Sequence, residues 1–156
     1  MRLYVHSPGS MEVTHIDEAD ANVSLSELIV VVEGDFVFVD DKGEPVDIAL
    51  TLIEIAVAAD THHHHIHHHS CKAIKVDITY NGRPVSMSVT PNLRVEDVLL
   101  QAIADFGIDP VSAADLVLRL PGTDQDISGS TFIGELVPRG DCTLKLNLLP
   151  GSREHG

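Results

Sequence analysis

Residues 74–90 read IKVDITYNGRPVSMSVT, a stretch that is typical of a β-hairpin. Apolar and polar residues alternate on both sides of Asn81-Gly82, so each side presents one apolar face. An Asn-Gly pair between two alternating runs is the strongest short-range signal for a tight hairpin turn. The sequence therefore predicts two paired, half-buried strands over 72–80 and 85–90.

A long amphipathic helix is predicted directly after this hairpin. Between Val95 and Phe106 apolar residues recur every three or four positions, which places them on one buried stripe. Gly107 is a typical residue at a helix end. Two further strands are expected over 116–120 and 142–149. The predicted core packs Val98, Leu99, Ile103 and Phe106 against Ile74, Val76, Val89 and Leu146.

The first half of the chain has a similar outline with less regular patterns. Its predicted strands are 2–6, 11–17, 36–39 and 61–69. Ser24 followed by Glu27 is a capping-box pattern, which predicts a short helix within 24–32. Thirteen of the 24 acidic residues but only two of the ten basic residues precede residue 71. This shift places a domain boundary there, with domains over 1–70 and 71–151 and a flexible tail over 152–156.

Composition and charge exclude several classes of protein. The 156 residues carry a formal charge of −14 and show no basic stripe, which argues against binding nucleic acid or an anionic membrane. No apolar run approaches the roughly 20 residues that span a bilayer, and no signal peptide is recognisable, so we expect a cytoplasmic protein. In that compartment Cys71 and Cys142 are expected to be free rather than bridged. No catalytic constellation is visible, so an enzyme is the least favoured interpretation.

Four stretches follow one another in a characteristic order in the second half. They are Val95-Glu96-Asp97-Val98, Phe106-Gly107-Ile108-Asp109-Pro110, Gly129-Ser130-Thr131-Phe132 and Cys142-Thr143-Leu144-Lys145-Leu146-Asn147-Leu148. In this order they resemble ubiquitin and its relatives, which share the β-grasp fold. The resemblance implies an α+β protein of two tandem ubiquitin-like β-grasp domains, the first of them shortened.

The sequence at the junction between the two halves resembles a more specific group of ubiquitin-like proteins. A His-rich strand, then Cys71-Lys72, then a strand ending in Tyr80-Asn81-Gly82 is similar to the bacterial two-domain ubiquitin-like modifiers of antiphage conjugation operons. This resemblance implies a modifier that is a substrate rather than an enzyme and requires no cofactor. The implied partners are an activating enzyme, a conjugating enzyme, a JAMM-type deconjugating peptidase and lysines of target proteins.

The tail is expected to carry the reactive group. Members of this family present a C-terminal glycine to an activating enzyme, whose narrow channel admits a residue without a Cβ. We expect Gly156 to be conjugated; Gly151 is the alternative and requires a peptidase to remove the last five residues. Two other functions stay open: a non-covalent tandem β-grasp adaptor with an inert tail, and a His-rich metal-binding protein.

The histidine run over 62–69 holds seven of the ten histidines. On a strand, His63, His65 and His67 share one face, where imidazoles two residues apart can chelate Zn²⁺ or Ni²⁺. The simpler interpretation is a solvated last strand of the first domain.

Partner binding is expected on the outer face of the second sheet, by analogy with ubiquitin-like folds. The residues assigned to it are Val117, Arg119, Asn147 and Arg153. Only four lysines are present, which leaves little scope for chains linked through lysine.

Overall fold

The computed structural model describes residues 1–55 and 63–151. They form two four-stranded sheets, one in each half of the chain. The first consists of β1 (Arg2–His6), β2 (Val13–Ile16), β3 (Phe36–Val39) and β4 (His63–His69). The second consists of β5 (Ile74–Tyr80), β6 (Arg83–Val89), β7 (Leu116–Arg119) and β8 (Thr143–Pro150). The helical segments are α1 (Leu25–Leu28), α2 (Val95–Phe106), α3 (Pro110–Ala113) and the 3₁₀ helix η1 (Ile133–Leu136).

Both sheets have the same topology. The strand order is β2-β1-β4-β3 in the first and β6-β5-β8-β7 in the second. In each sheet an antiparallel pair comes first in the chain, and the last strand pairs in parallel with the first strand of that pair. The chain therefore contains two tandem β-grasp units, as predicted.

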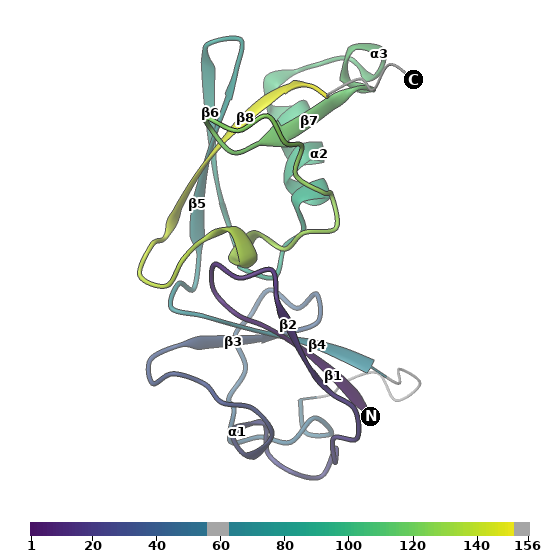
Figure 1. Ribbon diagram of the computed structural model, residues 1–156, viewed down its shortest axis with the longest axis vertical. Coiled ribbons are helices and arrows are strands. Elements are labelled where there is room, and N and C mark those ends of the chain that lie inside the picture. The colour runs from purple at the N-terminus through teal and green to yellow at the C-terminus, as the bar shows by residue number, and fades with distance from the viewer. Residues whose placement is uncertain (56–62, 152–156) are drawn as a thin grey trace.

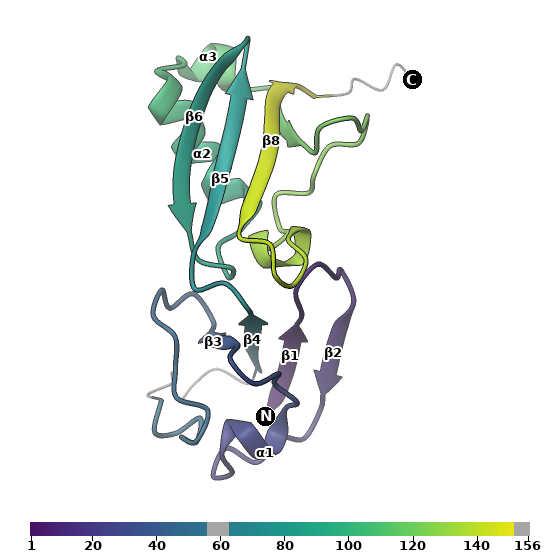
Figure 2. The same cartoon turned by 90° about the vertical axis from the view of Figure 1, so that its left-hand side faces the viewer.

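In the second domain α2 covers one face of the sheet (Figure 2). Val98 is fully buried and Phe106 nearly so, and both belong to one core with Ile74 and Leu146. The predicted core residues Val89, Leu99 and Ile103 are only half-buried, because they lie at the margins of this core. Within the described part of the chain, no helix is long and apolar enough to cross a membrane.

The first domain is the shortened one, since α1 has four residues where α2 has twelve. The capping-box prediction is wrong, because the Ser24 hydroxyl pairs with the Ser26 hydroxyl (3.1 Å) and caps no helix N–H. Residues 29–32 are Ile and Val, whose branched side chains favour extended backbone, so the helix ends after one turn. The core of this domain includes Leu3, Val5, Leu25, Val37, Val39, Leu52 and Ile66.

The second domain packs on the face of the first sheet that α1 leaves open. Figure 1 shows the first sheet between α1 below it and the second domain above it. Strand alternation produces the two faces: Leu3 and Val5 of β1 point into the core, so Tyr4 and His6 point to the other side. A sheet face that would otherwise contact solvent is therefore covered by the neighbouring domain.

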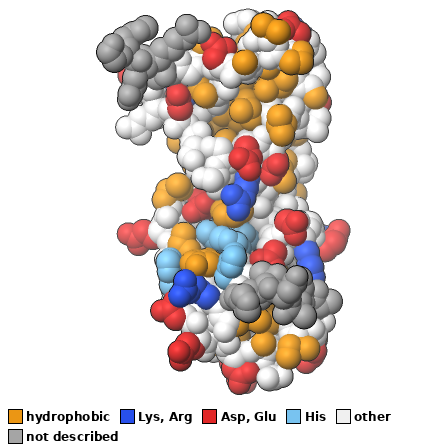
Figure 3. Space-filling model, turned by 90° about the vertical axis from the view of Figure 1, so that its right-hand side faces the viewer, with side chains coloured by type: hydrophobic (Ala, Val, Ile, Leu, Met, Phe, Trp, Pro, Cys, Tyr) orange, Lys and Arg blue, Asp and Glu red, His pale blue; other side chains and the backbone are white. Residues whose placement is uncertain are grey.

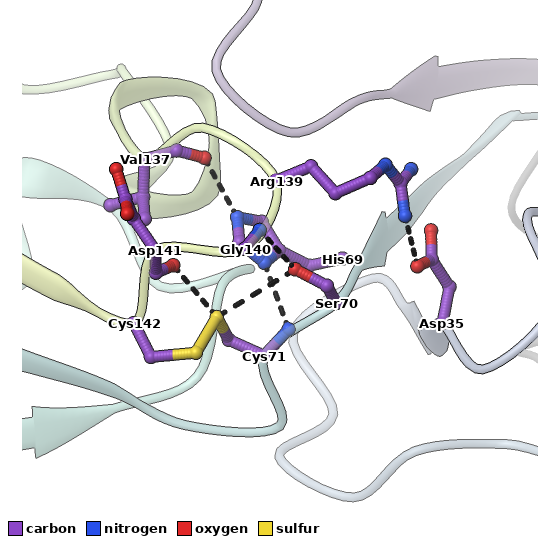
Figure 4. The surroundings of a disulfide bond; sticks show 9 residues. All are labelled: Asp35, His69, Ser70, Cys71, Val137, Arg139, Gly140, Asp141 and Cys142. Carbon is purple, nitrogen blue, oxygen red and sulfur yellow. Dashed lines mark hydrogen bonds and ion pairs between the residues drawn. A yellow bond between two sulfur atoms is a disulfide. The ribbon is translucent and has the colours of Figure 1, made fainter.

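Cys71 and Cys142 form a disulfide bond (Figure 4), so the expectation of two free thiols is wrong. Their Cα atoms are 5.7 Å apart although 71 residues separate them in sequence. Cys71 precedes β5 and Cys142 precedes β8, and these two strands are parallel. Parallel pairing brings the two strand beginnings together, which is why the cysteines meet.

Truncating a side chain of the second core should destabilise the protein. Leu146 is 1% exposed, whereas Leu100 of α2 is 67% exposed. Leu146→Ala should lower the free energy of unfolding by about 2–5 kcal/mol, because it removes buried apolar surface and leaves a cavity. Leu100→Ala, the matched control, should change it by less than about 0.5 kcal/mol. Urea denaturation followed by circular dichroism measures both, and equal losses would show that the core is misassigned.

Reduction of the disulfide should also lower stability. A cross-link that closes a loop of 71 residues restricts the unfolded chain, which is worth about 4 kcal/mol in the chain-entropy treatment. Dithiothreitol should therefore lower the melting temperature of the natural sequence. It should not affect the double variant Cys71→Ala, Cys142→Ala. A melting temperature of the natural sequence that does not respond to the reductant would contradict a stabilising bond.

Candidate functional site

The last strand, β8, leads to the tail and lies between β5 and β7 in the second sheet. Gly151 follows it, and the Gly151 N–H donates to the carbonyl oxygen of Asp115 (2.8 Å). A Cβ at Gly151 would lie 3.2 Å from Cγ1 of Val117 and 3.3 Å from Oδ2 of Asp126, closer than side chains ordinarily pack. Gly151 is therefore held against the edge of the folded sheet.

Three of the predicted partner-binding residues lie together on the outer face of the second sheet, which Figure 2 turns toward the viewer. Arg119 of β7 pairs directly with Asn147 of β8, and Val117 is two residues away on the same face. Asn147 is exposed, and the other two are half-buried. The Arg119 guanidinium also forms an ion pair with Asp126 (2.7 Å). The remaining predicted residues of the tail, Arg153 and Gly156, lie outside the described residues.

Residues 63–69 of the histidine run form β4, and His62 lies outside the described residues. β4 is not the solvated strand that the simpler interpretation predicted. His64, His67, His68 and His69 are all at most 8% exposed. His63 is exposed and His65 is half-buried. These histidines are buried because β4 lies between β1 and β3, with the core of the first domain on one face and the second domain on the other. Figure 3 shows histidine side chains gathered on the first domain, close below the second.

We define the imidazole face as His6, His65, His67 and His69, four histidines that point away from the core of the first domain and lie against the second domain. Phe132 of the second domain lies among the first three of them. Its ring centroid is 4.8 Å from that of His6, 5.6 Å from that of His65 and 4.4 Å from that of His67. These distances are those of packed aromatic pairs, so the two domains share an aromatic cluster.

A buried carboxylate accompanies this cluster. Glu135 of η1 is 7% exposed, and its Oε2 lies 3.7 Å from Nδ1 of His6. Its Oε1 accepts the Phe132 N–H (2.9 Å), which fixes the carboxylate beside the ring. Nε2 of His6 pairs with Nδ1 of His65 (2.8 Å). A cavity of about 10 Å³ beside His6, His67 and Glu135 has room for a single water molecule.

His69 ties the two domains together through both of its ring nitrogens (Figure 4). Its Nε2–H donates to the carbonyl oxygen of Val137 (2.8 Å), and its Nδ1 accepts the N–H of Cys71 (3.0 Å). Only the neutral tautomer with its proton on Nε2 can form both bonds. One side chain of β4 therefore joins the segment after η1 to the chain beside the disulfide.

Two side chains of the second domain reach across to the first. Nδ2 of Asn92 donates to two carbonyl oxygens in the turn over 40–42 (2.9 and 2.8 Å). Arg139 forms an ion pair with Asp35. Burial alone raises the pKa of Asp35, but hydrogen bonds from Arg139 and His68 outweigh it and hold the pKa below its usual value.

Gly9 allows the turn between β1 and β2 to touch the second domain. Its φ of +62° lies in the left-handed region, and its N–H donates to the carbonyl oxygen of Gly134 (3.0 Å). A Cβ at Gly9 would lie 2.8 Å from Cα of Pro138, too close for any side chain. Sequence reasoning predicted this turn but none of the contacts between the domains.

The three histidines predicted to bind metal do not form a metal site in this structure. His65 already uses Nδ1 in its bond to His6, and His67 packs against Phe132. Among residues 1–55 and 63–151, no three His, Cys, Asp or Glu side chains meet in an arrangement that could hold a metal ion.

Comparison with known proteins places the chain in a family. Residues 75–151 match the family model described as BilA ubiquitin-like domain 2. The chain is a tandem ubiquitin-like protein of the BilA type. The match covers the second domain of this BilA-type protein, and it confirms the resemblance to two-domain ubiquitin-like proteins. No curated protein matches the sequence.

Several solved structures resemble about half of this BilA-type protein. Ubiquitin of Caldiarchaeum subterraneum is 18% identical with a TM-score of 0.41, over 53% of this chain and 99% of that protein. A protein designed on the basis of ubiquitin is 20% identical with a TM-score of 0.41, over 54% and 95%. The N-terminal ubiquitin-like domain of the 4931431F19Rik protein is 14% identical with a TM-score of 0.39, over 54% and 80%.

Three side chains of this BilA-type protein, His65, His67 and His69, are hard to protonate. Burial lowers the pKa of His67 to about 2, and the neighbouring His6, His65, Arg94 and His68 add to the effect. Burial is also the main cause that lowers the pKa of His65 and of His69. These rings are therefore neutral at pH 7, which is the form that the packing and the hydrogen bonds require.

Acidification should destabilise the BilA-type protein. Because the pKa of His67 is lower in the folded state than the value of about 6.5 in the unfolded state, the unfolded state binds more protons between these values. Stability is thus full above about pH 6.5 and falls as the pH drops, by up to about 1.4 kcal/mol per pH unit for this group. Urea denaturation between pH 7.5 and 5 measures the slope.

His67→Gln should flatten that slope, since glutamine does not titrate. His15→Gln, a change at an exposed histidine of β2, is the matched control and should leave the slope unchanged. Equal slopes in the two variants would mean that His67 is not the group responsible.

Proposed function

We propose that this BilA-type protein is a ubiquitin-like modifier that is conjugated through Gly156 to lysines of target proteins in bacterial antiphage defence. The observation that supports this most directly is the position of Gly151, which is bonded to Asp115 at the edge of the second sheet. A glycine held there is poorly placed to enter the active site of another protein. Gly156 follows five residues later, and five residues reach at most about 17 Å when extended. Gly156 is therefore the better candidate for the reactive end.

The proposed reaction makes this protein a substrate that supplies no catalytic group. Its terminal carboxylate attacks the α-phosphate of ATP on an activating enzyme, which releases pyrophosphate and leaves an acyl adenylate. A cysteine thiolate of the enzyme displaces AMP and forms a thioester. After transfer to the cysteine of a conjugating enzyme, the amine of a target lysine attacks the thioester carbonyl. The thiolate leaves, and an isopeptide bond remains, which a JAMM-type peptidase hydrolyses.

The outer face of the second sheet is the proposed docking surface for the activating enzyme. Val117, Arg119 and Asn147 lie together on it, and Val117 is the nearest side chain to Gly151. An enzyme that binds this face is thus positioned where the tail leaves the sheet. Arg153 adds a positive charge between this face and Gly156.

Replacing the terminal glycine should block activation. Incubated with its cognate activating enzyme and ATP, the natural chain should form a thiol-sensitive adduct, visible on a non-reducing gel. Gly156→Arg should reduce this adduct at least a hundredfold, because a long side chain beside the reacting carboxylate obstructs the narrow channel. Gly151→Ala is the matched control; it crowds Val117 within the fold but leaves the end of the tail unchanged, so its adduct should persist.

A chain truncated after Gly151 distinguishes the two candidate ends. If that chain and Gly156→Arg both form the adduct while Gly151→Ala loses it, the reactive residue is Gly151. If none of the three changes affects the adduct, or if the natural chain forms none, the modifier proposal fails. Melting curves of all variants exclude unfolding as the cause of a loss.

A further inference from the structure

The disulfide bond shortens the connection between the two sheets. β4 ends at His69 and β5 begins at Ile74, so four residues, 70–73, connect them. Cys71 is the second of these four, and its bond to Cys142 attaches it to the start of β8. While the bond is closed, Ser70 alone separates β4 from a point that is covalently attached to the second domain. Once the bond is open, the whole connection of four residues is available for the domains to move apart.

Residues 137–142 of the second domain hold this connection and the first domain in place (Figure 4). The Gly140 N–H donates to the hydroxyl oxygen of Ser70 (2.9 Å), and Arg139 forms its ion pair with Asp35 of the first domain. These are polar contacts, each of which can open and form again. The disulfide is the covalent bond among them, so it sets how far the partners separate each time the polar contacts open.

The two cysteines differ in their access to solvent. Cys142 is exposed, whereas Cys71 is 2% exposed. A thiolate opens a disulfide by attacking a sulfur atom that it can reach, so Sγ of Cys142 is the point of attack and Cys71 is the leaving group. The carbonyl oxygen of Asp141 lies 2.8 Å from Sγ of Cys71. The thiol that Cys71 regains on reduction therefore has a hydrogen-bond acceptor already in place.

We propose that Cys142 is the site at which a dithiol protein reductant opens this bond, and that the opening releases the first domain from the second. The sequence predicts a cytoplasmic protein, and disulfide bonds in that compartment are usually transient. One accessible sulfur atom and a position between two domains suit such a reversible bond. With the bond closed, the second domain covers the imidazole face. With the bond open, this face separates from Phe132 and meets solvent.

The reaction is a thiol–disulfide exchange in two steps. A thiolate of the reductant attacks Sγ of Cys142, the bond between the two protein sulfur atoms breaks, and Cys71 leaves as a thiolate that takes up a proton. The second thiol of the reductant loses its proton and attacks the reductant sulfur of the mixed disulfide, and Cys142 leaves and is protonated. Two electrons and two protons pass from the dithiol to this protein, and the dithiol becomes a disulfide.

The length of the connection sets the size of the effect. The effective concentration of one domain at the other falls roughly as the −3/2 power of the length of a flexible connection. A change from one residue to four therefore lowers it about eightfold. The separated form of the two domains becomes more populated by the same factor, while the fold within each domain is retained.

Amide hydrogen exchange of the full-length protein, oxidised and reduced with a phosphine, tests the release. The Gly9 N–H bonds to Gly134 of the other domain and reports separation, whereas the N–H groups of Val46 and Ile127 bond within the first and the second domain. Reduction should speed exchange at Gly9 about eightfold and at the two control amides less than about twofold. Equal acceleration at all three would mean that reduction only destabilises the fold, and an unchanged rate at Gly9 would mean that the domains stay packed. Either result overturns the proposal.

Two insertions test whether the length of the connection is the cause. Two glycines inserted after Ser70 lengthen the free part of the connection from one residue to three, which should speed Gly9 exchange about fivefold in the oxidised protein. Two glycines inserted after Lys72 are the matched control. They lie between Cys71 and β5, where the disulfide bypasses them, so the oxidised protein should keep its Gly9 rate. Equal rates in the two insertion proteins would refute the role of connection length.

A trapping experiment identifies the sulfur atom that is attacked. The probe is a thioredoxin in which the second cysteine of the Cys-x-x-Cys motif is replaced by serine, so that the mixed disulfide cannot resolve. Incubated with the oxidised natural protein, it should accumulate as an adduct on Cys142, which peptide mapping by mass spectrometry locates. An adduct on Cys71, or no adduct at all, would contradict the assignment. None of these measurements depends on conjugation through Gly156.

Discussion

Phe132 lies among the rings of His6, His65 and His67, and the packing of the two domains depends on His65 and His67 being neutral. A neutral imidazole has a flat aromatic surface for the phenyl ring and polar edges that still form hydrogen bonds. An aliphatic side chain could supply only the first, and a lysine would bring a buried charge. Placing several histidines on one sheet face therefore produces an interface that is both packed and polar. The buried Glu135 carboxylate is compatible with this polar interface, because it lies beside an imidazole nitrogen of His6 rather than against aliphatic side chains.

Histidines on this sheet face also suit a domain that has little secondary structure of its own to cover the sheet. The first domain has a helix of one turn, so only one face of its sheet can be covered from within. Its other face is completed by residues of the second domain, which in the chain come after it. Histidines can be hydrated when that face is open and neutral when it is closed, whereas a face of Leu and Val would expose a large apolar patch in the absence of the second domain. His69 also connects this sheet face to the disulfide, because its Nδ1 accepts the N–H of Cys71.

The sequence predicted the features that depend on neighbouring residues and missed those that depend on contacts between residues far apart in the chain. The hairpin at Asn81-Gly82 and the helix from Val95 to Phe106 are local patterns, and both formed as predicted. The disulfide was missed because residues far apart in sequence meet only through parallel pairing of β5 and β8; two cysteines that each precede a strand of such a pair were the available signal. The buried state of the histidine run was missed for the same reason, since periodicity assigns faces to a strand but does not show what covers them. Local reasoning failed at Ser24, where a neighbouring hydroxyl competed for the cap.

The arrangement of the domains separates the surfaces on which function depends. The carboxyl end of β8 lies at the end of the second domain that is opposite the first domain (Figure 1). An enzyme that engages the tail and the outer face near Val117 therefore approaches from the far end of the molecule. The junction at the imidazole face is not in its path, so the proposed conjugation leaves the packing of the first domain intact. In the proposed function the first domain is a fixed extension of the modifier, and it carries thirteen of the 24 acidic residues of the chain.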